Sequence, residues 1–181
     1  WRWMPDYAEM NELQAERDLP RMFLDPEATQ MSCMKSVVHN VQQRSYAHHI
    51  ERLMVLGNFS LIAGINPQQL TNWMWENFID AAEWVMVPNV IGMSQFADGG
   101  MITTKPYICG SNYLMKMGDF PKGAWQATWD GLFWRFLSKQ RVVFSKNPRW
   151  AMLLSTWDKM PLEKKETHLN NAEAFLAQLF T

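Results

Sequence analysis

The sequence has little of what several protein classes require. Only two cysteines occur among 181 residues, Cys33 and Cys109, too few for a disulfide framework or a zinc site, which fits a reducing cytoplasm. No run of about eighteen apolar residues occurs, so we expect no contact with a membrane. The net charge of -1 argues against binding of nucleic acid by bulk electrostatics, although it leaves room for a local basic patch.

Common catalytic motifs are missing as well. The chain has no glycine-rich phosphate loop, no His-Glu-x-x-His and no Gly-x-Ser-x-Gly elbow. It begins at Trp1 with neither an initiator Met nor a signal-peptide pattern, so we expect a fragment of a longer protein. No segment alternates apolar and polar residues for long, as a half-buried strand would. Because no strand pattern is present, the sequence predicts an all-α helical bundle.

Large, polarisable side chains are abundant instead. The ten Trp, ten Phe and fourteen Met residues are suited to filling irregular helical cores, and less often to flanking flat ligands. Apolar spacing, caps and breakers predict an irregular segment over residues 1–30 with two or three turns at 7–16, and a loop region over 87–111. The helices that we expect span 32–56, 67–85 from an Asn66 cap, 112–117, 129–144 capped by Asp130, a stretch after Asn147-Pro148, and 161–179.

The first long helix carries titratable residues where leucines are expected. Its apolar stripe runs from Met34 to Leu56 and includes His48 and Arg52, with His49 on its shoulder. Buried histidine and arginine normally need partners. The pattern leaves two interpretations open, hydrogen-bonded core residues or a site of unknown chemistry. The two adjacent histidines project about 100° apart and are poor partners for one metal ion. Asp80 and Glu83 are either an acid/base pair or a solvated helix surface.

Three longer motifs are more specific than the spacing of apolar residues. They are HHIERLMV at 48–55, EWVMVPNVIGMSQFADGG at 83–100 and TKPY at 104–107. In this order they closely resemble the bacterial photolyase and cryptochrome family that carries an iron-sulfur cluster, and the resemblance extends from about Trp3 to Trp157. It implies that residues 1–181 are the C-terminal portion of a helical FAD-binding domain. The resemblance also implies that the N-terminal antenna domain and the early flavin-domain helices are missing from these residues, so we expect the fragment alone to be inactive and to bind FAD weakly or not at all.

The resemblance also implies roles for individual residues. His49 matches the catalytic histidine that donates a proton to a six-four photoproduct, with His48 beside it, a role suited to an imidazole pKa of about 6.5. Asn89 matches the residue that faces the reactive flavin nitrogen. The remaining matches are the cofactor-region residues Arg52, Asp80 and Glu83, the lesion-pocket residues Met93, Tyr107 and Tyr113, and the electron-transfer residue Trp73.

The chain departs from the family pattern at its metal cluster and electron relay. Of the four cluster cysteines only Cys33 remains, and the other three positions align with Pro121, Ala124 and about Ala127. One thiolate does not hold a four-iron cluster, so we expect no iron-sulfur cluster and no other metal. A tyrosine of the family relay is Met74 here, and an expected aromatic residue is Asp25.

The resemblance implies a light-dependent DNA repair enzyme, a photolyase of the lyase class, that acts on UV-damaged DNA and most simply on six-four photoproducts. The alternative is a cryptochrome-like blue-light photoreceptor without repair activity. The implied cofactor is FAD, and the implied partners are damaged DNA and the upstream antenna and flavin-domain half of the same protein. Retention of the two histidines, Arg52, Tyr107 and Tyr113 favours repair, because a photoreceptor needs no lesion pocket. The altered relay positions favour the photoreceptor.

Overall fold

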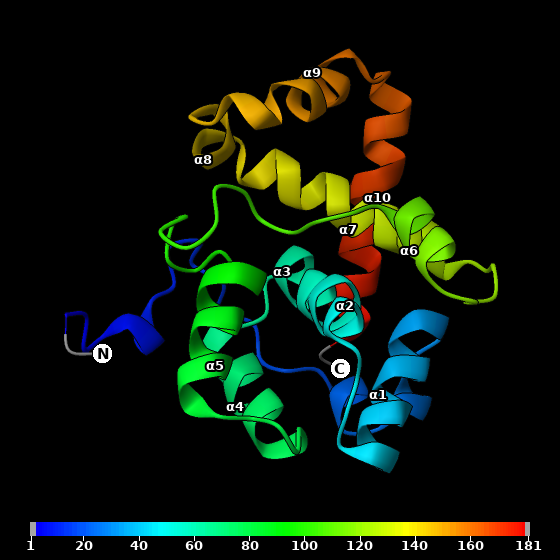
Figure 1. The fold of residues 1–181 in the computed structure, drawn as a ribbon. Coiled ribbons are helices and arrows are strands. Elements are labelled where there is room, and N and C mark those ends of the chain that lie inside the picture. The colour runs from blue at the N-terminus through cyan, green and yellow to red at the C-terminus, as the bar shows by residue number, and fades with distance from the viewer. Residues whose placement is uncertain (1–2, 180–181) are drawn as a thin grey trace. The chain divides into compact units, whose positions relative to one another are not determined.

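The computed structural model of the protein describes residues 3–179, which divide into two units between Ile108 and Cys109. The described residues contain helices and no strand, apart from one isolated bridge between Arg17 and Ile65. The all-α prediction is therefore confirmed (Figure 1). No described helix is both long and apolar enough to cross a membrane.

The first unit contains short and long helical segments of three kinds. Its 3-10 turns are η1 (Tyr7–Glu9), η2 (Arg21–Phe23) and η3 (Pro26–Ala28). Its α-helices are α1 (Ser32–Arg44), α2 (His49–Glu51), α3 (Asn58–Ala63), α4 (Pro67–Asn77) and α5 (Glu83–Val87). Two π-helical segments, η4 (Arg52–Gly57) and η5 (Pro88–Ser94), continue α2 and α5 without a break.

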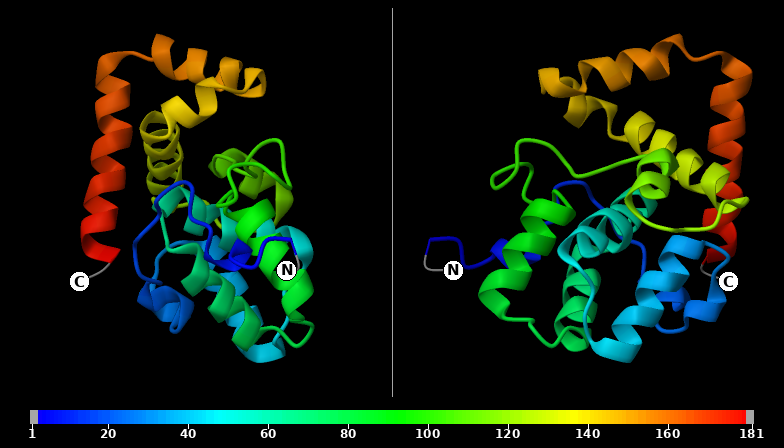
Figure 2. Two further views of the ribbon diagram at one scale, coloured as in Figure 1. Left: turned by 90° about the vertical axis from the view of Figure 1, so that its left-hand side faces the viewer. Right: turned by 45° about the vertical axis from the view of Figure 1, so that its right-hand side comes forward.

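The second unit is built from more regular helices. They are α6 (Ser111–Met117), α7 (Trp125–Lys139), α8 (Arg141–Ser145), the 3-10 turn η6 (Pro148–Trp150), α9 (Ala151–Lys159) and α10 (Leu162–Leu179). Helix α10 lies along α7 (Figure 2). Gly131 permits this close approach, because a Cβ there would lie 2.7 Å from the carbonyl oxygen of His168. Trp129 and Leu132 are fully buried beside it.

The predicted helix over residues 32–56 is wrong in one important respect, because it is interrupted between α1 and α2. Ser45 adopts a left-handed conformation with φ 50°, and its N–H donates to the Val41 carbonyl at 2.7 Å, which ends α1. The Ser45 carbonyl in turn accepts from the N–H of Ile79, beyond α4, at 2.9 Å. A contact distant in sequence thus supports the break, which helical spacing alone does not reveal.

The interruption changes which residues are buried. The α1 part of the predicted stripe, including Met34 and Val37, is buried, as is Leu56. The prediction that His48 lies on this buried stripe is wrong: both His48 and His49 are exposed, and Arg52 is half-buried. The helical phase restarts at His48, so its side chain does not follow the α1 face.

Several other boundaries also differ from those expected. Helix α4 ends at Asn77 and not near residue 85, because Phe78 turns the backbone into an extended conformation. Residues 88–94, expected to be a loop, form the π-helical segment η5. Only Tyr7–Glu9 of the first predicted turns is helical. Helix α7 starts at Trp125, so Asp130 lies inside it and instead accepts hydrogen bonds from the Ser111 N–H at 2.7 Å and the Ser111 hydroxyl at 2.9 Å, at the start of α6.

The cap and breaker predictions agree better with the structure. Asn66 Oδ1 accepts from the N–H groups of Gln68 and Gln69, with Pro67 at the first helical position, as expected. Asn147 accepts from the Arg149 N–H at the start of η6. The helices predicted over 112–117 and 161–179 match α6 and α10. Local signals thus located these starts correctly.

Candidate functional site

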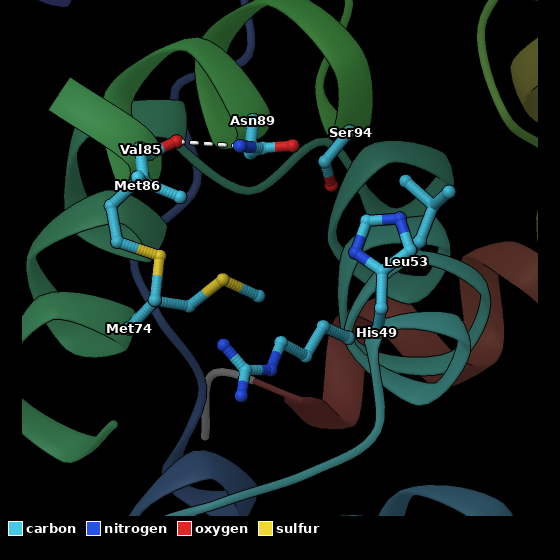
Figure 3. Close-up of a pocket in the computed structure, with 8 residues that line it drawn as sticks. His49, Leu53, Met74, Val85, Met86, Asn89 and Ser94 are labelled. Atoms are coloured by element: carbon cyan, nitrogen blue, oxygen red, sulfur yellow. Dashed lines mark hydrogen bonds between the residues drawn. The ribbon is translucent and has the colours of Figure 1, made fainter. Parts of the chain in front are cut away.

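A pocket of about 80 Å³ lies within the first unit, lined by three helical segments (Figure 3). The connected α2 and η4 segments contribute one side, α4 contributes Met74, and α5 with η5 contribute the opposite side. The lining residues are His49, Arg52, Leu53, Met74, Val85, Met86, Asn89 and Ser94. Three residues that the sequence singled out, His49, Arg52 and Asn89, are therefore brought together.

Half of these residues lie on the two π-helical segments, η4 and η5, which are joined to each other by side-chain hydrogen bonds. Gln95 Nε2 donates to the Gly57 carbonyl at 2.9 Å and to Ser94 Oγ at 2.8 Å, all three residues being buried. Gly57 permits this close approach, because a Cβ there would overlap Ser94 Oγ. Wide π turns leave backbone groups without regular helical partners and are frequent at functional sites. The Gln95 side chain thus links the two pocket walls.

Arg52 is the most constrained side chain of the pocket. Its Nε donates to the Ala47 carbonyl at 2.7 Å, and its two terminal nitrogens each donate to Asp80 at 3.0 Å. The guanidinium also lies 4.2 Å from the centre of the Phe78 ring and 5.0 Å from that of Tyr46. Arg52 thus presents a fixed positive charge with a paired carboxylate, as bidentate Arg–carboxylate geometry allows.

The two histidines have different places. His49 lines the pocket, whereas His48 is the N-cap of α2 and does not line it. His48 Nδ1 accepts from the Ile50 N–H at 3.2 Å, and Glu51 accepts from the His48 N–H at 3.0 Å. Because both residues are exposed at the start of this helix, His49 is open to solvent on one side and to the pocket on the other. Figure 3 shows its ring beside Leu53.

The amide nitrogen of Asn89 is hydrogen-bonded, whereas its amide oxygen has no partner among the described residues. Its Nδ2 donates to the Val85 carbonyl at 2.7 Å, one turn earlier on the same helix. This bond orients the amide, so its oxygen lies on the side of Ser94, as Figure 3 shows. The sulfur-bearing side chains of Met74 and Met86 lie on the opposite side of the space (Figure 3). The pocket therefore combines an amide acceptor, an apolar wall and a fixed cation.

Two proteins of known sequence are similar to this chain. The (6-4) photolyase of Agrobacterium fabrum is 41% identical over 189 residues, covering 99% of this chain and 37% of that protein. Uncharacterized protein R855 of Acanthamoeba polyphaga mimivirus is 39% identical over 127 residues, covering 70% of this chain and 100% of that protein. No protein-family model matches the chain.

This similarity supports membership of the photolyase family. The chain spans little more than a third of the length of the (6-4) photolyase that it matches. The photolyase resemblance inferred from the motifs is therefore supported at the level of the family.

The remaining residues matched to photolyase roles lie outside the pocket. Trp73 is buried in the first unit, its indole nitrogen donating to the Phe23 carbonyl at 3.1 Å. Met93 is half-buried in η5, and Tyr107 is exposed. Tyr113 belongs to the second unit, on the exposed side of α6. Glu83 is exposed in the first turn of α5. Asp80, the other carboxylate of the predicted pair, accepts hydrogen bonds from the pocket residue Arg52.

The pocket also contains residues that the sequence did not assign to it. Leu53, Val85, Met86 and Ser94 were missed, and Met74 was noted only as a departure from the photolyase pattern. Gly57 lies directly after the expected end of the 32–56 helix, and Gln95 appeared only as part of a motif. No local signal distinguishes these residues, because their role depends on contact between segments far apart in sequence.

Cys33, which the resemblance matches to a cluster cysteine, has the position of a core residue. Cys33 is fully buried in α1, and Cys109 is also buried. Pro121, Ala124 and Ala127, which the resemblance aligns with the other cluster positions, are exposed. Within residues 3–179, no group of three or more His, Cys, Asp or Glu side chains is arranged to hold a metal ion.

Proposed function

We propose that this chain is the C-terminal portion of the FAD-binding domain of a light-dependent enzyme that repairs UV-damaged DNA, with six-four photoproducts as substrate. The observation that carries the proposal is the meeting of His49, Arg52 and Asn89 in one pocket, in a chain 41% identical to a (6-4) photolyase. A proton donor, a fixed charge and an oriented amide are a suitable set for a site that works on a cofactor and a substrate together.

The pocket residues fit one edge of a flavin. Asn89 offers its unengaged amide oxygen to a ring N–H, and the guanidinium of Arg52 lies in a geometry already fixed by Asp80. Met74 and Met86 supply a polarisable apolar wall for a flat ring. At about 80 Å³ the pocket is smaller than the roughly 300–1,000 Å³ of enclosed ligand sites. These residues therefore border the ring and do not enclose it, and the upstream half of the protein completes the site.

When bound, FAD supplies the light-driven electron for repair. The chain's own contribution begins with His49, whose exposed position at the pocket edge lets it meet both solvent and a lesion. An imidazole gives and regains a proton near neutral pH, because its ordinary pKa is about 6.5. We assign it the transfer of a proton to the damaged base. Asp80 acts through Arg52, and Asn89 orients the cofactor ring.

A lesion inside a duplex must leave the base stack before it can reach such a site. We assign Met93, Tyr107 and Tyr113 to the walls that replace its lost stacking contacts, because apolar and aromatic side chains serve flipped bases in this way. Trp73 is assigned to electron transfer to the flavin. We assign no metal cluster to the protein, because positions 121, 124 and 127 carry no thiol.

The proposal is tested with the natural protein that carries this sequence, loaded with FAD and reduced. Duplexes with a single six-four photoproduct, or with a cyclobutane dimer as the comparison, are illuminated with blue light and analysed by chromatography. We expect light-dependent repair of the six-four lesion and none in the dark. Stoichiometric FAD with no repair of either lesion contradicts the proposal and favours the cryptochrome-like photoreceptor.

A further inference from the structure

We propose that His48 is a positioning residue whose imidazole caps the helix that carries His49 and Arg52, and that it is not a proton donor. This proposal concerns the same pocket and rests on the proposed function for its activity measurement. The two histidines are adjacent and chemically identical, so sequence alone gives them the same role. The structure separates them, because only His49 lines the pocket.

The cap is a reciprocal pair of hydrogen bonds. His48 Nδ1 accepts from the Ile50 N–H at 3.2 Å, and the Glu51 carboxylate accepts from the His48 N–H at 3.0 Å. The first N–H groups of a helix have no partner within the helix, and side-chain acceptors normally satisfy them. Asn, Asp, Ser and Thr are the usual residues at this position. A histidine here has the acceptor role that an Asn side chain can also fill.

This cap lies at the start of the helical run that carries the pocket residues His49 and Arg52. The chain has just left the left-handed turn at Ser45, and residues 49–63 then form one continuous helical run through α2, η4 and α3. The Arg52 N–H donates to the His48 carbonyl at 3.0 Å, and the Arg52 side chain donates to the Ala47 carbonyl at 2.7 Å. The cap therefore fixes the start of the helix one residue before His49 and one turn before Arg52.

The cap also restricts the chemistry of His48. An accepting Nδ1 needs its lone pair, so the ring proton of His48 is on Nε2 and the imidazole is neutral. A doubly protonated ring has only donors and cannot accept from Ile50. His48 would have to give up its cap each time it took up a proton for transfer. His49 carries no such constraint, since no described group holds either of its ring nitrogens.

The proposal predicts that the acceptor at position 48 matters and the imidazole does not. In the FAD-loaded natural protein, His48→Asn should keep light-driven repair within about threefold of wild type, because Asn is among the best N-cap residues. His48→Ala should lower repair and should speed amide hydrogen exchange at Ile50 about fivefold to tenfold, the size expected for loss of one cap. His39→Asn, on the exposed side of α1, is the matched control and should change neither.

Two outcomes overturn the proposal. One is loss of repair by about a hundredfold in His48→Asn while the Ile50 amide stays protected, which would make the imidazole itself the acting group. The other is unchanged Ile50 exchange in His48→Ala, which would show that the cap does not hold the helix. If wild-type protein repairs no lesion at all, the proposed function fails, but the exchange measurement still decides whether His48 is the cap.

Discussion

The π-helical pair η4 and η5 of the first unit and the α7 and α10 pair of the second both pack closely, but they do so in different ways. In both, a glycine permits close approach, Gly57 next to Ser94 and Gly131 next to the α10 backbone. The second pair consists of regular helices in direct backbone contact. The first has wide turns bridged by the Gln95 side chain, and it carries the candidate site. Irregular backbone is found where function is proposed, and regular backbone where it is not.

The largest expected contrast comes from adding one methyl group at each glycine. Gly131→Ala should lower the free energy of unfolding by about 1–3 kcal/mol, because the new Cβ meets the His168 carbonyl, which cannot rotate away. Gly57→Ala meets the Ser94 hydroxyl, so the double variant with Ser94→Ala should recover most of its loss. Urea denaturation followed by circular dichroism measures all three variants. A Gly57→Ala loss that Ser94→Ala does not relieve would show that the first pair is equally rigid.

Two arginine–aspartate pairs provide a second comparison. Arg52–Asp80 and Arg141–Asp158 are both bidentate, but the Arg52 side chain is 16% exposed and that of Arg141 is 47% exposed. Arg52→Lys should destabilise the protein by about 1–3 kcal/mol, because the Ala47 carbonyl and Asp80 lose charge-assisted hydrogen bonds. Arg141→Lys should cause no measurable change, because exposed pairs contribute little. Equal effects in thermal unfolding would mean that the Phe78 contact and burial of Arg52 add nothing.

These contrasts explain how much could be predicted from the sequence. Helices α6, α9 and α10 and the Asn66 cap follow from local spacing and cap residues, which act within a few positions. The break at Ser45, the end of α4 and the π turn at 88–94 do not. Contacts between distant residues occur at these places, such as Ile79 N–H with the Ser45 carbonyl and the Gln95 amide with the Gly57 carbonyl. A periodic pattern extended through such a break assigned His48 to the wrong face.

The candidate site was predictable by motif and not by periodicity. The motifs named His49, Arg52 and Asn89, which the structure places together. Spacing left two interpretations open, core residues or a site of unknown chemistry, and it wrongly placed His48 on a buried face. The motifs could not show that Asp80 pairs with Arg52 while Glu83 does not. The two carboxylates are close in sequence after α4, Asp80 in the turn and Glu83 at the first residue of α5. Side-chain partners depend on the three-dimensional path of the chain.

The smallest effect concerns His168 in the regular pair of the second unit. Burial lowers the pKa of His168, Lys164 lowers it further, and Asp130 opposes the shift. Its Nδ1 is buried with no hydrogen-bond partner among the described residues. The folded protein therefore binds this proton less readily than the unfolded chain, and stability should fall as the pH drops below about 6.5. His168→Gln should make the melting temperature less sensitive to pH between about 7.5 and 5.5, as differential scanning fluorimetry would show. An identical pH slope in the variant would contradict this.

The central claim is that the irregular pair positions His49 to transfer a proton, and single-turnover repair by His49→Ala tests it most directly. With flavin content and lesion binding matched to wild type in the natural protein, the account predicts a loss of light-driven six-four repair of about a hundredfold to ten-thousandfold, the usual contribution of a general acid. Removal of a packing contact alone would change the rate only a few-fold. Repair by His49→Ala at the wild-type rate would contradict the assignment of His49 and with it the proposed function of the pocket.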